Sequence, residues 1–229
     1  MATTVKKWRI KMFNEKISLL KKGIIDYAEH VEGMLVKSLD GTINRNEEIL
    51  YNVIDKEESV ANKYEIEFDE ICINYIAQYQ PVGKNLRAIV SAIKMSNDLE
   101  RMADHAVNIA QNGLFLISHP FIKPFIDIPK MSDVTVGMLK DSIKSFVNED
   151  ICLAKKVLEG DNEVDNLKIK VIDELTGIMS KDPKTVSRAL KLINIASNLE
   201  RVADLTTNIC EDVIYLSEGV VVKHHQLNK

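Results

Sequence analysis

Glycine, proline and cysteine are scarce in this chain of 229 residues, which has nine glycines, five prolines and three cysteines. The cysteines, Cys72, Cys152 and Cys210, are far apart in the sequence and odd in number. They therefore match neither a disulfide framework nor the close pairs of a zinc ribbon. We expect them to be small buried residues in a reducing compartment.

Long apolar runs and a net excess of basic charge are also missing. No stretch of about 18 apolar residues could span a membrane, and residues 1–9 lack the apolar core of a signal peptide. The net charge of 30 − 34 = −4 gives no general attraction to nucleic acid or anionic membranes. We expect a soluble cytoplasmic protein that does not bind nucleic acid and does not insert into the membrane.

Between the few glycines and prolines, apolar residues recur at helical spacing. Three prolines fall within residues 118–130 (SHPFIKPFIDIPK), which cannot be a helix interior. This segment predicts a linker between a first domain, 14–117, and a second, 131–219, with a tail at 220–229. The predicted helices span residues 14–48, 51–79, 84–117, 131–159, 162–180 and 184–218.

Three short segments predict the breaks between helices. Residues 159–161 (Glu-Gly-Asp) are typical of a helix end followed by a new start. Asp182 and Pro183 predict an N-cap and the first helical position of the last helix. Residues 44–46 (Asn-Arg-Asn) are compatible with either a turn or a helix interior.

The two halves of the chain repeat each other. Residues 33–35 (Gly-Met-Leu) recur at 137–139, an offset of 104, and residues 99–101 (Leu-Glu-Arg) recur at 199–201, an offset of 100. Between 97–109 and 197–209, seven of thirteen positions are identical. Such similarity indicates an internal duplication.

The last helix of each half carries a regular apolar seam with spacings of three and four. In the second half the seam consists of Leu192, Ile195, Leu199, Val202, Thr206, Ile209, Val213 and Leu216. In the first half it consists of Ala92, Met95, Leu99, Met102, Ala106, Ile109, Gly113 and Leu116. Such seams pack against partner helices. The expected fold is all-α, with two tandem three-helix bundles side by side or end to end.

A polar stripe accompanies each seam, with acidic and amide residues at i, i+4 and i+8. The stripes consist of Glu100, Asp104 and Asn108, and of Glu200, Asp204 and Asn208. Each set lies on one side of its helix, away from the centre of the seam. Paired carboxylates repel each other unless a cation is near, and hard cations prefer oxygen donors. Iron, manganese, magnesium and zinc all fit such donors.

A complete metal site would need carboxylates from a neighbouring helix as well. The candidates are Asp55, Glu57, Glu58 and Glu65 in the first half, and Asp161, Glu163, Asp165 and Asp173 in the second. The alternative is a solvated face whose carboxylates pair with nearby arginines. His105 follows the first stripe's Asp104, but Leu205 stands in its place in the second stripe, so His105 is a weaker ligand candidate. No motif nominates a nucleophile or a general base, so we expect no enzyme.

Several long motifs resemble the PhoU family of phosphate-specific transport system accessory and regulatory proteins. Residues 80–82 (QPV), 86–87 (LR) and 97–110 (NDLERMADHAVNIA) are similar to the family's first-half signature. Residues 198–219 (NLERVADLTTNICEDVIYLSEG) are similar to its second-half signature, and 161–165 (DNEVD) resemble the start of its middle helix. The resemblance covers residues 14–219.

The resemblance implies two three-helix bundles related by pseudo-twofold symmetry. It also implies metal ions, often in multinuclear clusters, bound by Glu100, Asp104, Glu200 and Asp204. Asn108, Asn208 and Asp98 match the same motifs, although Asn198 stands opposite Asp98. Family members negatively regulate a phosphate ABC transporter, at its cytoplasmic ATPase side, and a phosphate-sensing histidine kinase. They are often dimers, so a homodimer is compatible with the resemblance, although no seam here is left over for one.

Three departures from the family pattern leave alternatives open. Leu205 replaces the usual histidine, Ala103 replaces the usual glycine, and Ala61 stands where the second half has Asp165. The two sites therefore need not hold the same number of ligands or the same metal. A related protein serving another transporter or channel is one alternative function, and a metal-dependent hydrolase or oxidase is another.

Overall fold

A computed structural model describes the backbone of residues 2–221 and the side chains of residues 12, 13 and 15–221. Its helices are α1 (Ala2–Ile43), α2 (Glu47–Asn52), α3 (Glu58–Tyr79), α4 (Lys84–Ile117), α5 (Asp127–Asn148), α6 (Ile151–Lys181) and α7 (Val186–Glu218). A π-helical turn, Val53–Glu57, joins α2 to α3, and a 3₁₀ turn, Pro183–Thr185, precedes α7. No strand is present within residues 2–221, which confirms the all-α prediction.

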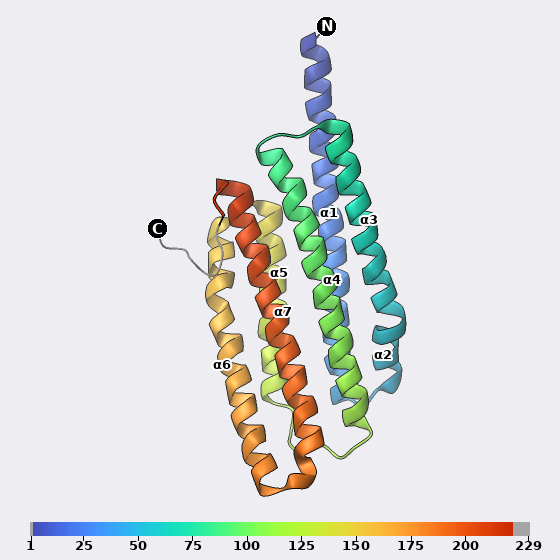
Figure 1. Cartoon of the computed structure of the whole chain (residues 1–229), viewed down its shortest axis with the longest axis vertical. Helices are drawn as coiled ribbons and strands as arrows, with labels where there is room; N and C mark the ends of the chain where they lie inside the picture. Colours follow the sequence, from blue (N-terminus) through green and yellow to red (C-terminus); the bar gives the residue numbers. More distant parts are fainter. Residues whose placement is uncertain (1, 222–229) are drawn as a thin grey trace.

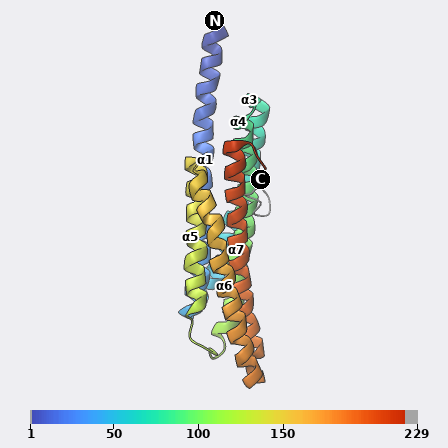
Figure 2. The same ribbon diagram turned by 90° about the vertical axis from the view of Figure 1, so that its left-hand side faces the viewer.

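The helices form two three-helix bundles that lie side by side (Figure 1). One contains α1, α3 and α4, and the other contains α5, α6 and α7. Turning the molecule shows that α1 and α5 lie in one layer, on the left of Figure 2, and that α7 lies in a second layer to their right together with α3 and α4. The bundles meet mainly where α4 packs on α7, and also where α1 packs on α5.

The predicted seams form the centre of the core. Every one of their sixteen residues is buried, and Leu99 and Leu199 are both fully buried. The prediction of buried thiols is confirmed for Cys72 and Cys210, but it is wrong for Cys152, which is exposed. Within residues 2–221, no helix combines the length and the apolar character needed to cross a membrane.

Two predicted helix boundaries of the second half are wrong. The helix predicted to stop at residues 159–161 continues through them, because α6 runs unbroken from Ile151 to Lys181. The break lies earlier, where Glu149 adopts a left-handed conformation (φ 54°) and Asp150 caps α6 by accepting a hydrogen bond from the Leu153 amide at 3.0 Å. The predicted N-cap at Asp182 is confirmed for the 3₁₀ turn that leads into α7, since the Asp182 carboxylate accepts from the Lys184 amide at 3.0 Å.

Equivalent left-handed residues end the first helix of each repeat, at Arg45 and Glu149. Residues 44–46 form a turn, which resolves the open alternative. The Arg45 guanidinium donates to the Ile117 carbonyl at 3.1 Å and the His119 carbonyl at 3.0 Å. Glu149 pairs with Lys21 of α1 at 3.0 Å and with Lys84 at the start of α4. Contacts with distant segments thus stabilise a backbone conformation that non-glycine residues rarely adopt.

The π-helical turn changes the register between the two middle helices. Before it, buried Leu50 corresponds to buried Ala154, at an offset of 104. After it, the buried residues Ala61, Phe68 and Cys72 correspond to Val164, Val171 and Leu175, at an offset of 103. Because a π-helical turn accommodates one extra residue, Ala61 aligns with Val164 and not with Asp165.

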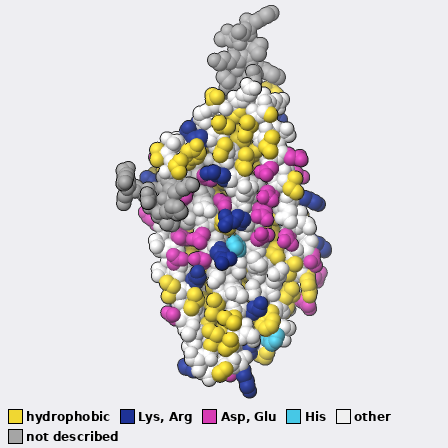
Figure 3. Space-filling view, viewed as in Figure 1, with side chains coloured by type: hydrophobic (Ala, Val, Ile, Leu, Met, Phe, Trp, Pro, Cys, Tyr) yellow, Lys and Arg dark blue, Asp and Glu magenta, His cyan; other side chains and the backbone are white. Residues whose placement is uncertain are grey.

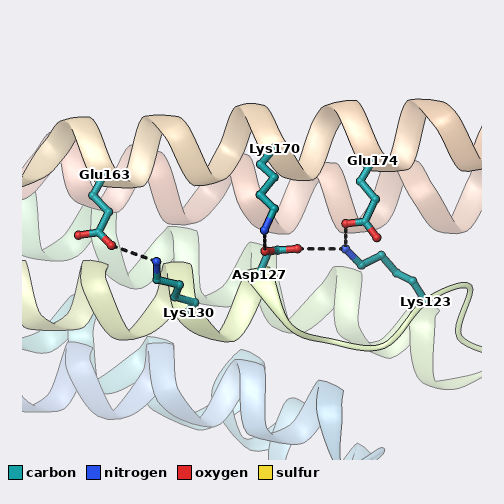
Figure 4. A network of polar contacts seen from close by, with 6 residues as sticks. All are labelled: Lys123, Asp127, Lys130, Glu163, Lys170 and Glu174. Carbon is teal, nitrogen blue, oxygen red and sulfur yellow. Dashed lines mark hydrogen bonds and ion pairs between the residues drawn. The ribbon is translucent and has the colours of Figure 1, made fainter.

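The proline-containing linker is shorter than predicted, because α5 begins at Asp127 and includes Pro129 in its first turn. Proline is tolerated there because the first turn needs no intrahelical amide donor. An ionic network, shown in Figure 4, holds this junction against α6. The buried Asp127 carboxylate accepts from Lys170 at 2.7 Å, Lys123 bridges Asp127 and Glu174, and Lys130 pairs with Glu163 at 3.3 Å.

The Asp127→Asn variant tests this network. The hydrogen bond from Lys170 is the main reason why the pKa of Asp127 lies below its usual value, with Lys123 adding to it. A carboxyl with a lowered native pKa stabilises the fold above its unfolded pKa and loses that contribution as pH falls. We expect the variant to lose about 1 kcal/mol at pH 7, and the difference from wild type to shrink below about pH 4. Urea denaturation of the variant and of wild type at several pH values measures the difference in the free energy of unfolding.

Asp133→Asn is the matched control, because Asp133 is an exposed carboxylate on the same helix and forms no ion pair with any described residue. Its free energy of unfolding should stay within about 0.5 kcal/mol of wild type. Equal losses in the two variants would contradict a specific role for the network.

A close approach between α1 and α4 depends on Gly113. A Cβ atom at this position would overlap the Thr42 hydroxyl and lie 3.2 Å from the Thr42 Cβ. Thr42 is fully buried and donates to the Ser38 carbonyl at 2.7 Å, so it cannot yield freely. We expect Gly113→Ala to lower the free energy of unfolding by about 1–3 kcal/mol.

The control for this prediction is Gly177→Ala on α6. A Cβ at Gly177 meets nothing within 4 Å, so its better helix propensity should raise stability by about 0.5–1 kcal/mol. Chemical denaturation of both variants gives the sign of each change. A Gly113→Ala protein as stable as wild type would show that α1 and α4 can separate without cost.

Candidate cation-binding surface

The two predicted stripes lie on α4 and α7, at the surface of their bundles. Glu100 and Glu200 are partly buried, whereas Asp104, Asn108, Asp204 and Asn208 are exposed. This placement agrees with the prediction that the stripes lie at a bundle edge and not in the core. It follows from the helical period, since residues next to a buried seam residue in the sequence point elsewhere.

In the first bundle, α3 brings further carboxylates towards Glu100. Burial is the main cause that raises the pKa of Glu100, and the negative charges of Asp104, Glu65 and Glu58 raise it further, against the opposing effect of Arg101. Glu58 and Glu65 were among the predicted middle-helix candidates. We call Glu58, Glu65, Glu100 and Asp104 the acidic cluster.

Other acidic residues of the first half have different partners. Glu57 lies in the π-helical turn and is buried. Its carboxylate accepts hydrogen bonds from Lys37 at 2.6 Å and from Asn52 at 2.8 Å. Glu57 is therefore already neutralised within the first bundle, unlike the acidic cluster.

Tyr27 of α1 is a further member of this region that the sequence analysis missed. Its side chain is fully buried and stacks on Tyr64, with ring centroids 4.9 Å apart. Burial, followed by the charges of Glu100, Glu65 and Asp104, raises its pKa. The hydroxyl has no hydrogen-bond partner among the described residues. Buried hydroxyls usually have one. No sequence pattern indicates this feature, because Tyr27 occupies an ordinary core position.

The donor chemistry of the first bundle fits a hard cation, because carboxylate and hydroxyl oxygens are what such ions prefer. Within the described side chains, however, no three His, Cys, Asp or Glu residues are grouped closely enough to hold a metal ion as they stand. The cluster is therefore a concentration of negative charge and not a preformed coordination shell. A cation bound there would neutralise this charge and would be held by oxygens of the acidic cluster.

The second stripe has a different environment. Glu200 forms an ion pair with Lys168 of α6, with Nζ 3.1 Å from Oε1. The two side chains are only 26% and 19% exposed, so solvent screens the pair incompletely. The other predicted acid Glu163 pairs with Lys130.

Asp98 and Asn208 meet each other on a different side of α4. Both line a groove of about 640 Å³ between α4 and α7. Burial is the main cause that raises the pKa of Asp98 to about 6, and the negative charge of Asp212 raises this pKa further. The charge of Arg101 and a hydrogen bond with Asn208 act in the opposite direction. The seven predicted metal ligands therefore do not come together in one site. Asp98 and Glu100, for example, are two positions apart and point to opposite sides of the helix.

His105 also contacts the other repeat, since its Nδ1 lies 2.9 Å from Asn198 Oδ1. Burial is the main cause that lowers its pKa; the Asn198 contact opposes this, and the charges of Arg201 and Arg101 lower it further. The two arginines are equivalent in the repeats and are exposed. Figure 3 shows basic side chains in the middle of the face formed by α4 and α7, with acidic side chains on both sides.

The sequence and the fold both match known proteins over most of their length. The family model described as PhoU domain matches residues 24–113 and again residues 128–213. A phosphate-specific transport system accessory protein PhoU homolog of Aquifex aeolicus is 36% identical over 220 residues, covering 96% of this chain and 99% of that protein. PhoU homolog 2 of Thermotoga maritima is 35% identical over 213 residues, covering 93% and 90%.

The crystal structure of PhoU from Pseudomonas aeruginosa superposes with a TM-score of 0.86 at 27% identity, covering 91% of this chain and 100% of that one. The duplication and the paired bundles thus have counterparts in proteins of one kind, and we conclude that this chain belongs to the PhoU family.

Proposed function

We propose that the protein is a cytoplasmic accessory protein of phosphate-specific transport, which restrains the transporter and a phosphate-sensing histidine kinase through protein contacts and not by catalysis. The observation that carries the proposal is that both repeats match the PhoU domain, while relatives at 35–36% identity are named accessory proteins of that transport system. Negative regulation and the kinase partner rest on the family resemblance.

The α4–α7 face is the surface best suited to such contacts. Arg101 of α4 and Arg201 of α7 are both exposed, and the charges of both act on His105. Figure 3 shows basic side chains in the middle of this face, with acidic side chains on both sides. A pattern of opposite charges steers partners of complementary pattern and fixes their orientation more than it adds affinity. The cytoplasmic ATPase of a phosphate ABC transporter is the partner that the proposal names first.

The face can be tested by partner capture. We expect the Arg101→Glu/Arg201→Glu variant to bind the purified transporter ATPase at least tenfold more weakly than wild type, because each change reverses an exposed charge of the face. Biolayer interferometry gives the dissociation constants, and circular dichroism checks the fold. Lys156→Glu, an exposed charge reversal on α6, should bind like wild type.

Two results would redirect the proposal. Wild-type protein that ignores the phosphate-transporter ATPase but captures the ATPase or channel of another transport system would favour the related-protein alternative. Turnover of a phosphoester that disappears with Asp104→Asn would support a hydrolase instead.

The proposal includes a metal ion, of which iron, zinc, manganese and magnesium are the candidates, bound at the acidic cluster of the first bundle. Support comes from the electrostatic crowding around Glu100 and from the buried Tyr27 hydroxyl beside it, which has no hydrogen-bond partner in the described part of the chain. A bound cation would join α3 to α4 and change the charge that the first bundle presents to a partner. Whether the ions form a multinuclear cluster stays a prediction.

Elemental analysis of untagged protein, prepared without chelator, tests the metal. We expect at least one metal ion per chain in wild type, and its loss in the Glu100→Gln/Asp104→Asn variant, since two of the cluster's four carboxylates are then neutral. An Asn162→Asp variant, which adds an exposed acid on α6, should keep the wild-type content. Metal-free wild type after incubation with iron, zinc and manganese would leave the role to protein contacts alone. The predicted homodimer is measured in the same samples by light scattering.

A further inference from the structure

The two repeats place residues of opposite charge at the same position of the middle helix. With the offset of 103 that the buried residues require after the π-helical turn, Glu65 of α3 corresponds to Lys168 of α6. Glu65 acts on Glu100 as a like charge. Lys168 lies 3.1 Å from the carboxylate of Glu200, the equivalent of Glu100.

The arginine beside each stripe does not account for this difference. Arg101 follows Glu100 and Arg201 follows Glu200, so each repeat has the same arginine at the same place. The second bundle differs in having an additional ammonium group, that of Lys168, in direct contact with the stripe. At the equivalent position the first bundle has an additional carboxylate, that of Glu65.

The buried side chain beneath each stripe also differs between the repeats, and again only that of the first bundle is suited to a cation. Tyr27 corresponds to Met131 at the offset of 104, and both are fully buried. The Tyr27 hydroxyl lies within the field of Glu100, Glu65 and Asp104 and lacks a hydrogen-bond partner among the described residues. A methionine thioether needs no such partner. At this position, therefore, only the first bundle has a buried polar group, and no described residue supplies its partner.

A carboxylate that has an ammonium group about 3 Å away cannot also bind a divalent cation. The two positive charges would then lie close together, and they repel strongly in a partly buried site. We infer that Lys168 takes, in the second bundle, the place that a bound metal ion takes in the first, so that the protein binds metal at one bundle only. This inference rests on the proposed cation site in the first bundle. It extends that proposal by making the two faces chemically unequal.

Manganese titration of stripe variants tests the asymmetry. With Mn²⁺ alone as the probe, equilibrium dialysis should give binding at the first bundle that falls more than tenfold in Glu100→Gln/Asp104→Asn. The matched variant Glu200→Gln/Asp204→Asn should bind Mn²⁺ within twofold of wild type. Equal losses in both variants would overturn the inference.

Exchanging the charges gives a second readout that needs no metal. In the presence of EDTA, Glu65→Lys should raise the melting temperature by about 2–4 °C, because it supplies the missing cation, and it should abolish the shift caused by Mn²⁺. Lys168→Glu should lower the melting temperature by a similar amount in EDTA and add a second equivalent of bound Mn²⁺. If Lys168→Glu does not fold, Lys168→Met is used in its place, because it removes the charge and keeps a side chain of similar length. Lys168→Met should also lower the melting temperature in EDTA. Lys156→Glu is the control for a lysine on the same helix.

The outcomes separate the two proposals. Wild type that binds no Mn²⁺, together with the expected shifts in EDTA, would overturn the proposed cation site and still support Lys168 as the counter-ion of Glu200. Wild type that binds Mn²⁺, with Lys168→Glu and Lys168→Met unchanged in both metal content and melting temperature, would overturn the role of Lys168.

Discussion

Apolar packing of α4 against α7 joins the two repeats, and the position of every candidate functional group follows from it. The seams of both helices are buried along their full length, with Leu99 and Leu199 completely shielded from solvent. Once these residues face inward, the helical period turns Glu100 and Asp104 towards α3, and Glu200 towards α6. Asp98 and Asn208 turn into the groove between the two helices. One apolar constraint thus separates the polar residues of each motif into different environments.

Duplication gave the protein two similar backbones, but the charges along them have diverged. The turn at the end of each first helix illustrates this: Arg45 and Glu149 share a left-handed conformation, yet Arg45 donates to linker carbonyls and Glu149 accepts from two lysines. The stripes show the same divergence, with Glu65 beside one and Lys168 beside the other. A burial pattern shared between the repeats preserves the fold, because packing depends on shape and apolar area. Electrostatics remains free to differ at positions that packing does not constrain.

Polar contacts across the pseudo-twofold interface also tie the two stripes together. His105 of α4 lies against Asn198 of α7, and Asp98 of α4 lies against Asn208 of α7. Both contacts lie within one or two helical turns of Glu100 and Glu200. A cation that changed the charge at Glu100 would therefore act close to groups that contact the second repeat, and the α4–α7 face could present the change to a partner as a whole.

The sequence by itself determined that the chain is all-α and consists of two similar halves. The helical period, the internal repeat and the helix-breaking residues were enough to predict the sixteen seam residues, the surface position of the stripes and the cap at Asp182. Each of these depends on residues near in sequence or on the repeat itself. The break at Glu149 was missed because distant Lys21 and Lys84 contact the residue that ends α5. Gly160 stays helical because α6 is packed on both sides of it, through Val157 and Val164. The π-helical turn, the Tyr27 hydroxyl under the acidic cluster and the ion pair of Lys168 were likewise decided by tertiary structure, since they depend on which helices lie side by side and in which register.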